Sequence, residues 1–207
     1  ALISGPAGHG HAQLLGRLRR RFEEVSRRTH PVTIGCGPLW RTGGLQSLLR
    51  VLARETGVTE LASVDAAAAH LASLLAQKDV VLQVTALQNF EGGVDGFASQ
   101  FWAPLLAALP ASTPYRLLCL ATHEGRTPDA PAWDAATQPC GADPWEARRL
   151  VRLAALEPFT EEDLAFFLRR RVEPAQVEPM AQGLIDTTGG MPALLYDALT
   201  DPANWPV

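Results

Sequence analysis

The segment that most constrains this chain is the glycine-rich stretch at residues 5–12, which reads GPAGHGHA. A short apolar run at residues 1–4 precedes it, and a segment with one apolar helical face follows it. A strand, a glycine turn and a helix in this order place the helix N-terminus beside the end of the strand. Backbone N–H groups at such a point can bind an anion.

The stretch has the glycines of a phosphate-binding loop but lacks its reactive side chains. The working pattern is G-x-x-x-x-G-K-[ST], in which the lysine contacts phosphates and the hydroxyl ligates Mg²⁺. Gly5 and Gly10 occupy the two glycine positions, and Gly8 adds freedom between them. His11 stands at the lysine position and Ala12 at the Ser/Thr position. The octapeptide by itself is also compatible with a plain glycine turn before a helix.

The glycines are expected to be structural, with some of them at positive φ. His11 is expected to matter little for stability, because a loop histidine near a helix start has no obvious charge to meet.

Apolar runs alternate with helical patterns over the first 156 residues. After the first run, strands are predicted at residues 32–36, 80–84, 115–121 and 149–153. This alternation predicts a parallel sheet with helices on both faces. Ligands of such folds bind at the carboxyl ends of the strands, where the glycine stretch lies.

The last part of the chain changes character. Thr160 and Asp163 have the spacing of a helix capping box, and a TGGMP turn follows at residues 188–192. Three short helices are expected here. We therefore predict an α/β domain at residues 1–156 and a small helical domain at residues 157–207.

These features together resemble the STAND branch of the AAA+-like P-loop NTPases, signalling ATPases in which a nucleotide domain precedes a small helical domain. The likeness rests on residues 3–12, 153–164 and 188–192. The last of these matches the family's G-x-P turn, and by resemblance Pro192 is the proline that packs against nucleotide. The resemblance implies a P-loop NTPase-like three-layer sandwich, with a parallel sheet of order 5-1-4-3-2 and a C-terminal helical subdomain.

The chain departs from the family pattern at the positions whose side chains contact phosphate, organise Mg²⁺ or activate water. The family's third strand ends in an aspartate that organises Mg²⁺, often followed by an acid that activates water. Here Thr85 and Ala86 hold those positions. His123, near the tip of the fourth strand, stands close to where the family has a polar or basic sensor. With the lysine and hydroxyl also replaced, the chain is similar to inactive STAND domains of bacterial conflict and signalling proteins.

The resemblance implies a pseudo-NTPase that serves as a protein-interaction or scaffold module, with other proteins or fused effector and adaptor domains as partners. Two alternatives stay open. One is a nucleotide sensor that binds ATP or ADP without hydrolysis and without Mg²⁺, and the other is an NTPase that uses substituted residues. No catalytic or metal-ligating residue is assigned. The vestigial nucleotide-binding positions are Gly5, Gly8, Gly10, His11, Ala12, Thr85, Ala86, His123 and Pro192.

Composition and net charge limit the classes of partner that the chain is expected to bind. The net charge of −4 gives no whole-chain attraction to nucleic acid or to an anionic membrane. No apolar run approaches the ~20 residues of a membrane span, and no signal-peptide pattern opens the chain. The three cysteines show no metal-ligand spacing. We expect a cytoplasmic protein without a membrane partner or a clear nucleic-acid partner, and a homo-oligomer is compatible with the sequence.

Helix structure accounts for both arginine clusters of the sequence. Glu23 and Glu24 interrupt the first, at residues 17–28, which favours a solvated helix face over a polyanion patch. The second, at residues 169–171, ends a predicted helix, where cations suit the helix dipole.

Three further groups of residues each have a functional and a structural interpretation. His9 and His11, without a nearby cysteine or acid, are poor evidence for a metal site. Cys119 is expected to be a packed core thiol rather than a nucleophile paired with His123. Residues 122–145 read as a long surface loop, on which Trp133 and Trp145 either anchor a partner or cover the sheet edge.

Overall fold

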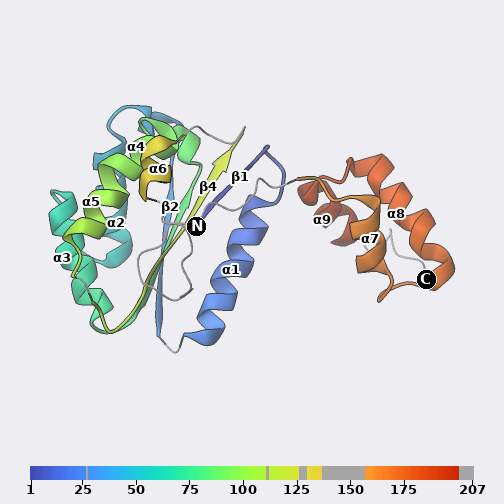
Figure 1. Ribbon diagram of the computed structural model, residues 1–207, viewed down its shortest axis with the longest axis horizontal. Coiled ribbons are helices and arrows are strands. Elements are labelled where there is room, and N and C mark those ends of the chain that lie inside the picture. The colour runs from blue at the N-terminus through green and yellow to red at the C-terminus, as the bar shows by residue number, and fades with distance from the viewer. Residues whose placement is uncertain (27, 111, 126–129, 137–156, 201–207) are drawn as a thin grey trace.

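The computed structural model describes residues 1–26, 28–110, 112–125, 130–136 and 157–200. Strands and helices alternate through the first part of the chain, and helices alone form the last part (Figure 1). The strands are β1 Leu2–Gly5, β2 Thr29–Gly35, β3 Asp79–Thr85 and β4 Leu117–Glu124. The helices are α1 His11–Val25, α2 Gly44–Thr56, α3 Val64–Leu75, α4 Gly93–Phe97, α5 Ala103–Ala108, α6 Pro131–Ala136, α7 Glu161–Leu168, α8 Pro174–Thr188 and α9 Pro192–Thr200. Two 3-10 turns, η1 Pro38–Arg41 and η2 Leu87–Asn89, and a π turn, η3 Ala98–Trp102, complete the described elements.

The four described strands form one parallel sheet in the order β1-β4-β3-β2. The α/β class with a parallel sheet is therefore confirmed, and the order agrees with the 1-4-3-2 part of the expected series. The expected fifth strand, residues 149–153, lies outside the described residues, so the five-stranded order stays a prediction.

β4 runs further than its apolar pattern indicates. A strand was expected at residues 115–121, but β4 ends at Glu124. Its added residues pair with β1, with Ser4 opposite His123 and Gly5 opposite Glu124. Backbone pairing with a neighbouring strand, which no local pattern reports, extends the strand through these polar residues.

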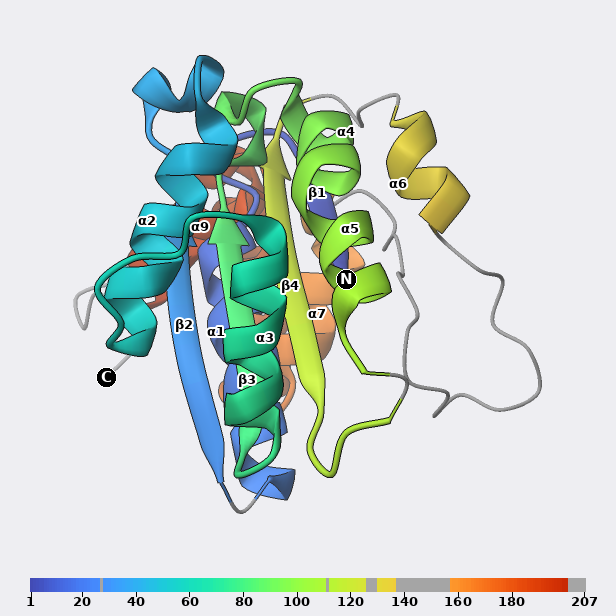
Figure 2. The same ribbon diagram turned by 90° about the vertical axis from the view of Figure 1, so that its left-hand side faces the viewer.

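The two faces of the sheet have separate cores, which follow from the alternation of side chains along each strand. Val80, Leu82 and Val84 of β3 lie in the larger core with α2, α3 and the α4–α5 segment. Val81 points the other way and packs with Leu15 of α1. Figure 2 shows α2, α3 and α5 over one face, with α1 behind the sheet. The sheet is thus the middle of three layers.

The segment at residues 122–145 is only partly the surface loop that its composition suggests. It begins with the end of β4 and includes α6, whose N-terminal Ala132 N–H donates to Asp95 Oδ1. Trp133 has 0% exposure and belongs to the larger core. The partner-anchor interpretation of Trp133 is therefore wrong, because its side chain is buried in the core where α6 packs against α4 and η3. Trp145 lies outside the described residues.

The helices α7, α8 and α9 share a core of their own and lie apart from the sheet, beside α1 (Figure 1). That core contains Leu164, Leu168, Val177, Ala181, Leu184 and Leu195. The predicted capping box is present: Thr160 Oγ1 accepts from the Asp163 N–H, and the Asp163 carboxylate accepts from the Thr160 N–H. The domain boundary after residue 156 stays a prediction, because residues 137–156 are outside the described part.

None of the helices in the described ranges combines the length and the apolar character needed to cross a membrane.

Asp79 joins three elements at the amino end of the sheet. Its side chain is almost fully buried. Oδ1 accepts from the Arg116 backbone N–H at 2.6 Å, and Oδ2 accepts from Ser26 Oγ at 2.6 Å and from the Arg116 guanidinium at 3.1 Å. Burial pushes the pKa of this carboxyl up, but the hydrogen bonds from Ser26 and Arg116 outweigh it and hold the pKa below its ordinary value of 3.8.

We expect Asp79→Asn to lower the free energy of unfolding by about 1–3 kcal/mol at pH 7, because an amide cannot satisfy all three donors. A depressed folded-state pKa stabilises the protein above the ordinary value, and this contribution disappears as pH falls through the folded-state pKa. Urea unfolding of both proteins should therefore show a gap that narrows below pH 4. The exposed substitution Asp197→Asn is the control. An equal loss in both variants would contradict the role assigned to Asp79.

Candidate functional site

The glycine stretch forms a tight loop between β1 and α1. Gly8 and Gly10 have φ of 82° and 80°, which confirms the expected left-handed conformations. The His9 N–H donates to the Pro6 carbonyl at 3.3 Å, and Leu14 N–H to the Gly10 carbonyl at 2.9 Å marks the first helical turn. Glycine freedom therefore sets the path from strand to helix.

The N-terminus of α1 keeps the frame of an anion site. Gly10 is the cap residue and provides no side-chain acceptor, and the first turn contains no acid. The first backbone N–H groups of a helix lack partners within the helix and carry partial positive charge. Backbone N–H groups of this kind are the ones that bind anions in other proteins.

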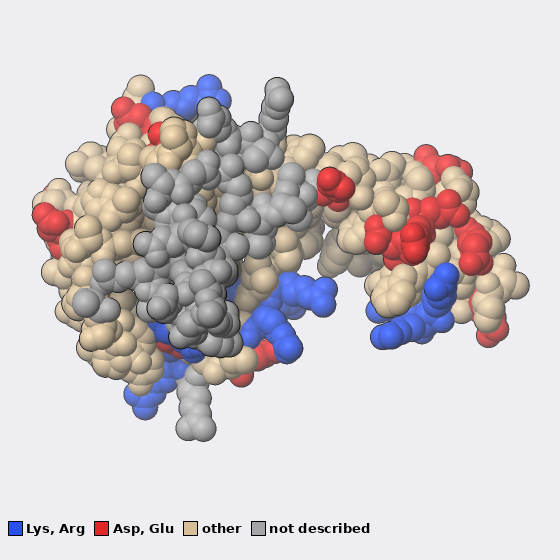
Figure 3. Space-filling view, viewed as in Figure 1, with Lys and Arg blue, Asp and Glu red and all other residues tan. Residues whose placement is uncertain are grey.

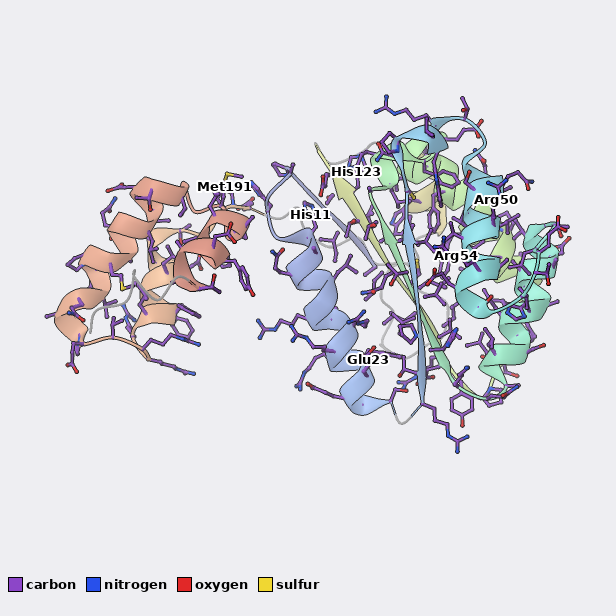
Figure 4. All side chains as sticks on the ribbon, turned by 180° about the vertical axis from the view of Figure 1, so that it is seen from behind. His11, Glu23, Arg50, Arg54, His123 and Met191 are labelled. Carbon is purple, nitrogen blue, oxygen red and sulfur yellow. The ribbon has the colours of Figure 1, made fainter. Side chains whose placement is uncertain are left out.

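The turn between α8 and α9 rests directly on this loop. Ala193 N–H donates to the Gly8 carbonyl at 3.1 Å. A Cβ at Gly8 would lie 2.7 Å from Met191 Cε, and one at Gly10 would lie 3.0 Å from Pro192 Cβ. Figure 4 shows Met191 on the side of the helical unit nearest the loop. The structure thus places Pro192 next to Gly10. Its expected packing against a nucleotide stays a prediction.

Gly190 fixes the shape of that turn. Its φ is 72°, and a Cβ here would overlap the Phe159 carbonyl oxygen. The Phe159 N–H in turn donates to the Gly190 carbonyl at 2.8 Å, and the buried Thr188 hydroxyl accepts from the Gly190 N–H at 3.2 Å. Sequence reasoning assigned the turn to Pro192 and missed Gly190. The Gly189-Gly190 doublet was the available signal.

His11 is a buried helix residue, which corrects the expectation that it lies in the loop. Its expected small effect on stability stays a prediction. It is the first residue of α1 and is 5% exposed. Its Nε2 has no hydrogen-bond partner within the described part of the chain. Burial lowers the pKa of His11, His9 and His123 lower it further, and Glu124 opposes the shift.

His123 lies at the same end of the sheet as His11, near the end of β4 (Figure 4). Burial lowers its pKa as well. The two histidines therefore favour the neutral form, unlike the lysine of a working loop, which is charged at neutral pH.

Thr85 is the last residue of β3 and Ala86 follows it, and neither side chain offers a carboxylate. The Thr85 carbonyl accepts from the Cys36 N–H at 2.9 Å. Ala86 has φ of 60°, the left-handed region, and its N–H donates to Thr122 Oγ1 at 3.3 Å. Within the described residues, no group of three or more His, Cys, Asp or Glu side chains could hold a metal ion. The donor set at the strand end does not fit Mg²⁺, which prefers carboxylate oxygens.

Cys119 is the packed core thiol that its position predicted. It lies within β4 and is buried. Burial raises the pKa of this thiol to about 11. A thiol with that pKa is a poor nucleophile at neutral pH, because the thiolate is the reactive form.

The fold is similar to those of several solved structures. ORC2 of Aeropyrum pernix, in ADPNP–ADP complexes, matches with a TM-score of 0.57 and 15% identity over 96% of this chain and 54% of that chain. Cdc6p of Pyrobaculum aerophilum matches at 0.49 with 15% identity, over 96% of this chain and 53% of its own. A Walker-type ATPase of Pyrococcus abyssi matches at 0.49 with 16% identity, over 94% of this chain and 60% of its own.

The chain therefore has a P-loop NTPase-like fold and spans 54% of the length of the ORC2 chain. No family model matches it, and no curated protein matches its sequence. At such low identity, the likeness establishes the fold alone.

Three glycine-to-alanine substitutions should change stability by different amounts, according to the backbone conformation and the space at each site. Gly190→Ala should lower stability most, by about 3 kcal/mol or more, because it combines positive φ with a backbone overlap. Gly8→Ala should cost about 1–2 kcal/mol, because the Met191 side chain can move aside. Gly16→Ala in α1, with open space around it, should add about 0.5–1 kcal/mol. Thermal melts of the three variants measure this order of stabilities. Gly8→Ala and Gly16→Ala proteins that both lose stability by the same amount would contradict it.

His11→Gln should reduce the dependence of stability on pH. A lowered folded-state pKa means that the unfolded chain binds more protons, so the parent loses stability as pH falls below the ordinary value of 6.5. The variant should lose less between pH 7.5 and pH 5.5, a window chosen around that value. Chemical unfolding at several pH values tests this. The remaining slope is expected because burial also lowers the pKa of His30 and His123; an unchanged slope would mean that His11 does not titrate differently on folding.

Proposed function

We propose that this chain is a catalytically inactive STAND-type P-loop domain, which acts as a cytoplasmic protein-interaction and scaffold module in a bacterial signalling or immunity protein. Its partners are other proteins or fused effector and adaptor domains. The proposal includes the five-stranded order 5-1-4-3-2 and a helical domain from residue 157. The observation that carries it is the direct contact of the α8–α9 turn with the glycine loop, through Ala193 N–H and the Gly8 carbonyl.

That contact supports the proposal because the chain's own backbone atoms make it, between Ala193 and Gly8. In a nucleotide-dependent domain, a bound nucleotide can bridge loop and helical unit, so that binding and release change their relation. Here Met191 and Pro192 already pack on Gly8 and Gly10. Such a contact suits a scaffold, because it holds the helices α7–α9 against the glycine loop through the chain's own atoms.

The side chains near the loop also support inactivity. Phosphoryl transfer depends on charge stabilisation by a lysine and by Mg²⁺ with its ligands. His11 is buried with a lowered pKa, and Ala12, Thr85 and Ala86 offer no carboxylate. Each loss of about 1.4 kcal/mol in transition-state stabilisation slows a reaction tenfold. Several such losses together leave no measurable turnover.

One observation favours the sensor alternative. The N-terminus of α1 has no side-chain cap and no acid in its first turn. Backbone N–H groups there can hold an anion without a lysine or a metal. A sensor would therefore bind ATP or ADP with little dependence on Mg²⁺.

The parent protein should show no phosphate release and no rise in melting temperature with millimolar ATP or ADP, with or without Mg²⁺. The double variant His11→Lys/Ala12→Thr restores the two side chains of the working loop, and ATP should raise its melting temperature. Its melt without ATP shows whether it folds.

Two results would overturn the proposal. Turnover by the parent, abolished by Gly10→Val, would show another catalytic set. A rise of several degrees in the parent with ATP, lost in His11→Gln, would establish the sensor. A Gly16→Ala protein serves as the control for changes in α1 that leave the loop intact.

A further inference from the structure

An open groove of about 740 Å³ lies between α1 on one side and α7 and α9 on the other, next to the glycine loop. Most of its lining is apolar and comes from both sides: Leu14, Phe159, Leu164, Phe167, Leu195 and Leu199. Tyr196, also in the lining, is 57% exposed, and Phe159 is 47% exposed. Apolar surface of this kind in water favours an occupant with apolar side chains.

Arginines stand on both walls of this groove. Arg17 belongs to α1, and Arg171 follows the end of α7. Figure 3 shows Lys and Arg gathered on the two parts of the molecule at the hollow between them. The sequence interpretations, a solvated face for one cluster and helix capping for the other, do not anticipate that the two clusters share a groove.

Neither arginine has an acidic partner among the described residues. The neighbours of Arg17 on α1 are paired: Arg19 with Glu23 at 3.5 Å and Arg21 with Glu24 at 2.7 Å. No such ion pair involves Arg17 or Arg171 in the described part of the chain. Arg17 and Arg171 therefore place two positive charges without ion-pair partners in a lining that also contains the acids Glu157 and Asp163.

Arg171 is held over the apolar lining. Its guanidinium lies 3.7 Å from the centroid of the Phe167 ring, and its Nη1 donates to the Phe167 carbonyl at 3.0 Å. Fixing the side chain in advance lowers the entropy that binding a carboxylate would cost. The Asp163 carboxylate accepts from the Thr160 N–H and hydroxyl, and no ion pair with Arg171 is found in the described part of the chain.

Like charges on two facing walls repel, and a negative group between them removes the repulsion. A carboxylate-bearing peptide with apolar side chains meets both demands, with acids toward the arginines and apolar groups on the floor. Single-stranded nucleic acid fits less well. Its bases need aromatic faces to stack on, whereas much of this lining is leucine.

We propose that this groove binds an acidic amphipathic segment of a partner protein, with its apolar side chains between α1 and α7–α9 and its carboxylates at Arg17 and Arg171. The proposal rests on the interaction function proposed above and names the chemistry of the partner.

The experiment selects peptides of about 16 residues, long enough for four helical turns, from a random display library against the immobilised protein. The same selection is run against Arg17→Glu/Arg171→Glu. The control is Arg50→Glu, an exposed charge reversal on α2, across the sheet from the groove (Figure 4). Melting temperatures confirm that all three proteins fold.

The parent and the Arg50→Glu control should both enrich peptides with Glu or Asp on one helical face and Leu or Phe on the other. The double variant should bind those peptides at least tenfold more weakly by fluorescence anisotropy and should enrich basic peptides instead. Raising the salt concentration should weaken parent binding, because surface charge attraction is screened.

Equal binding by the double variant, enrichment of basic peptides by the parent, or no enrichment at all would overturn the groove proposal. So would tight, arginine-dependent binding of an oligothymidylate probe without peptide enrichment. Each of these results leaves the inactive-domain proposal intact, since phosphate release and the ATP melt test that proposal separately. Displacement of selected peptides by ATP would instead overturn both.

Discussion

The arrangement of this protein depends on a close backbone approach between two segments that are about 180 residues apart in the chain. Gly8 and Gly10 leave room for Met191 and Pro192, and the Gly8 carbonyl accepts the Ala193 N–H. Both glycines have positive φ, so the conformation that turns β1 into α1 also presents the surface on which the α8–α9 turn rests. One conformational requirement thus serves a local turn and a long-range contact.

That contact gives the groove its second wall. The α8–α9 turn ends where α9 begins, and α9 contributes Leu195, Tyr196 and Leu199 to the groove lining. α1 supplies the facing wall, starting directly from the glycine loop. The loop therefore determines which two helical surfaces meet. In the proposed function it has exchanged the role of holding phosphate for that of holding two structural units together.

Much of the fold could be predicted from local patterns. β3, with apolar residues on both faces, and the capping box at Thr160 both follow from residue type and spacing. The glycine conformations followed because few other residues adopt positive φ easily. The burial of Trp133 could not be predicted, because prolines and small residues around it read as a loop, and only packing against α4 and η3 shows that it is core. The burial of His11 was also missed, because packing between distant segments decides it and its local sequence does not.

The sequence by itself determined the alternation of strands and helices in the sheet domain, the left-handed glycines of the loop and the presence of His11 and Ala12 after them, since each follows from a residue's identity and its neighbours. Tertiary structure alone decided that Gly190 must lack a side chain, that His11 is buried, and that Arg17 and Arg171 line one groove. These facts depend on distances between segments far apart in the chain. Local propensity and periodicity do not encode such distances, because they arise only when separate surfaces pack together.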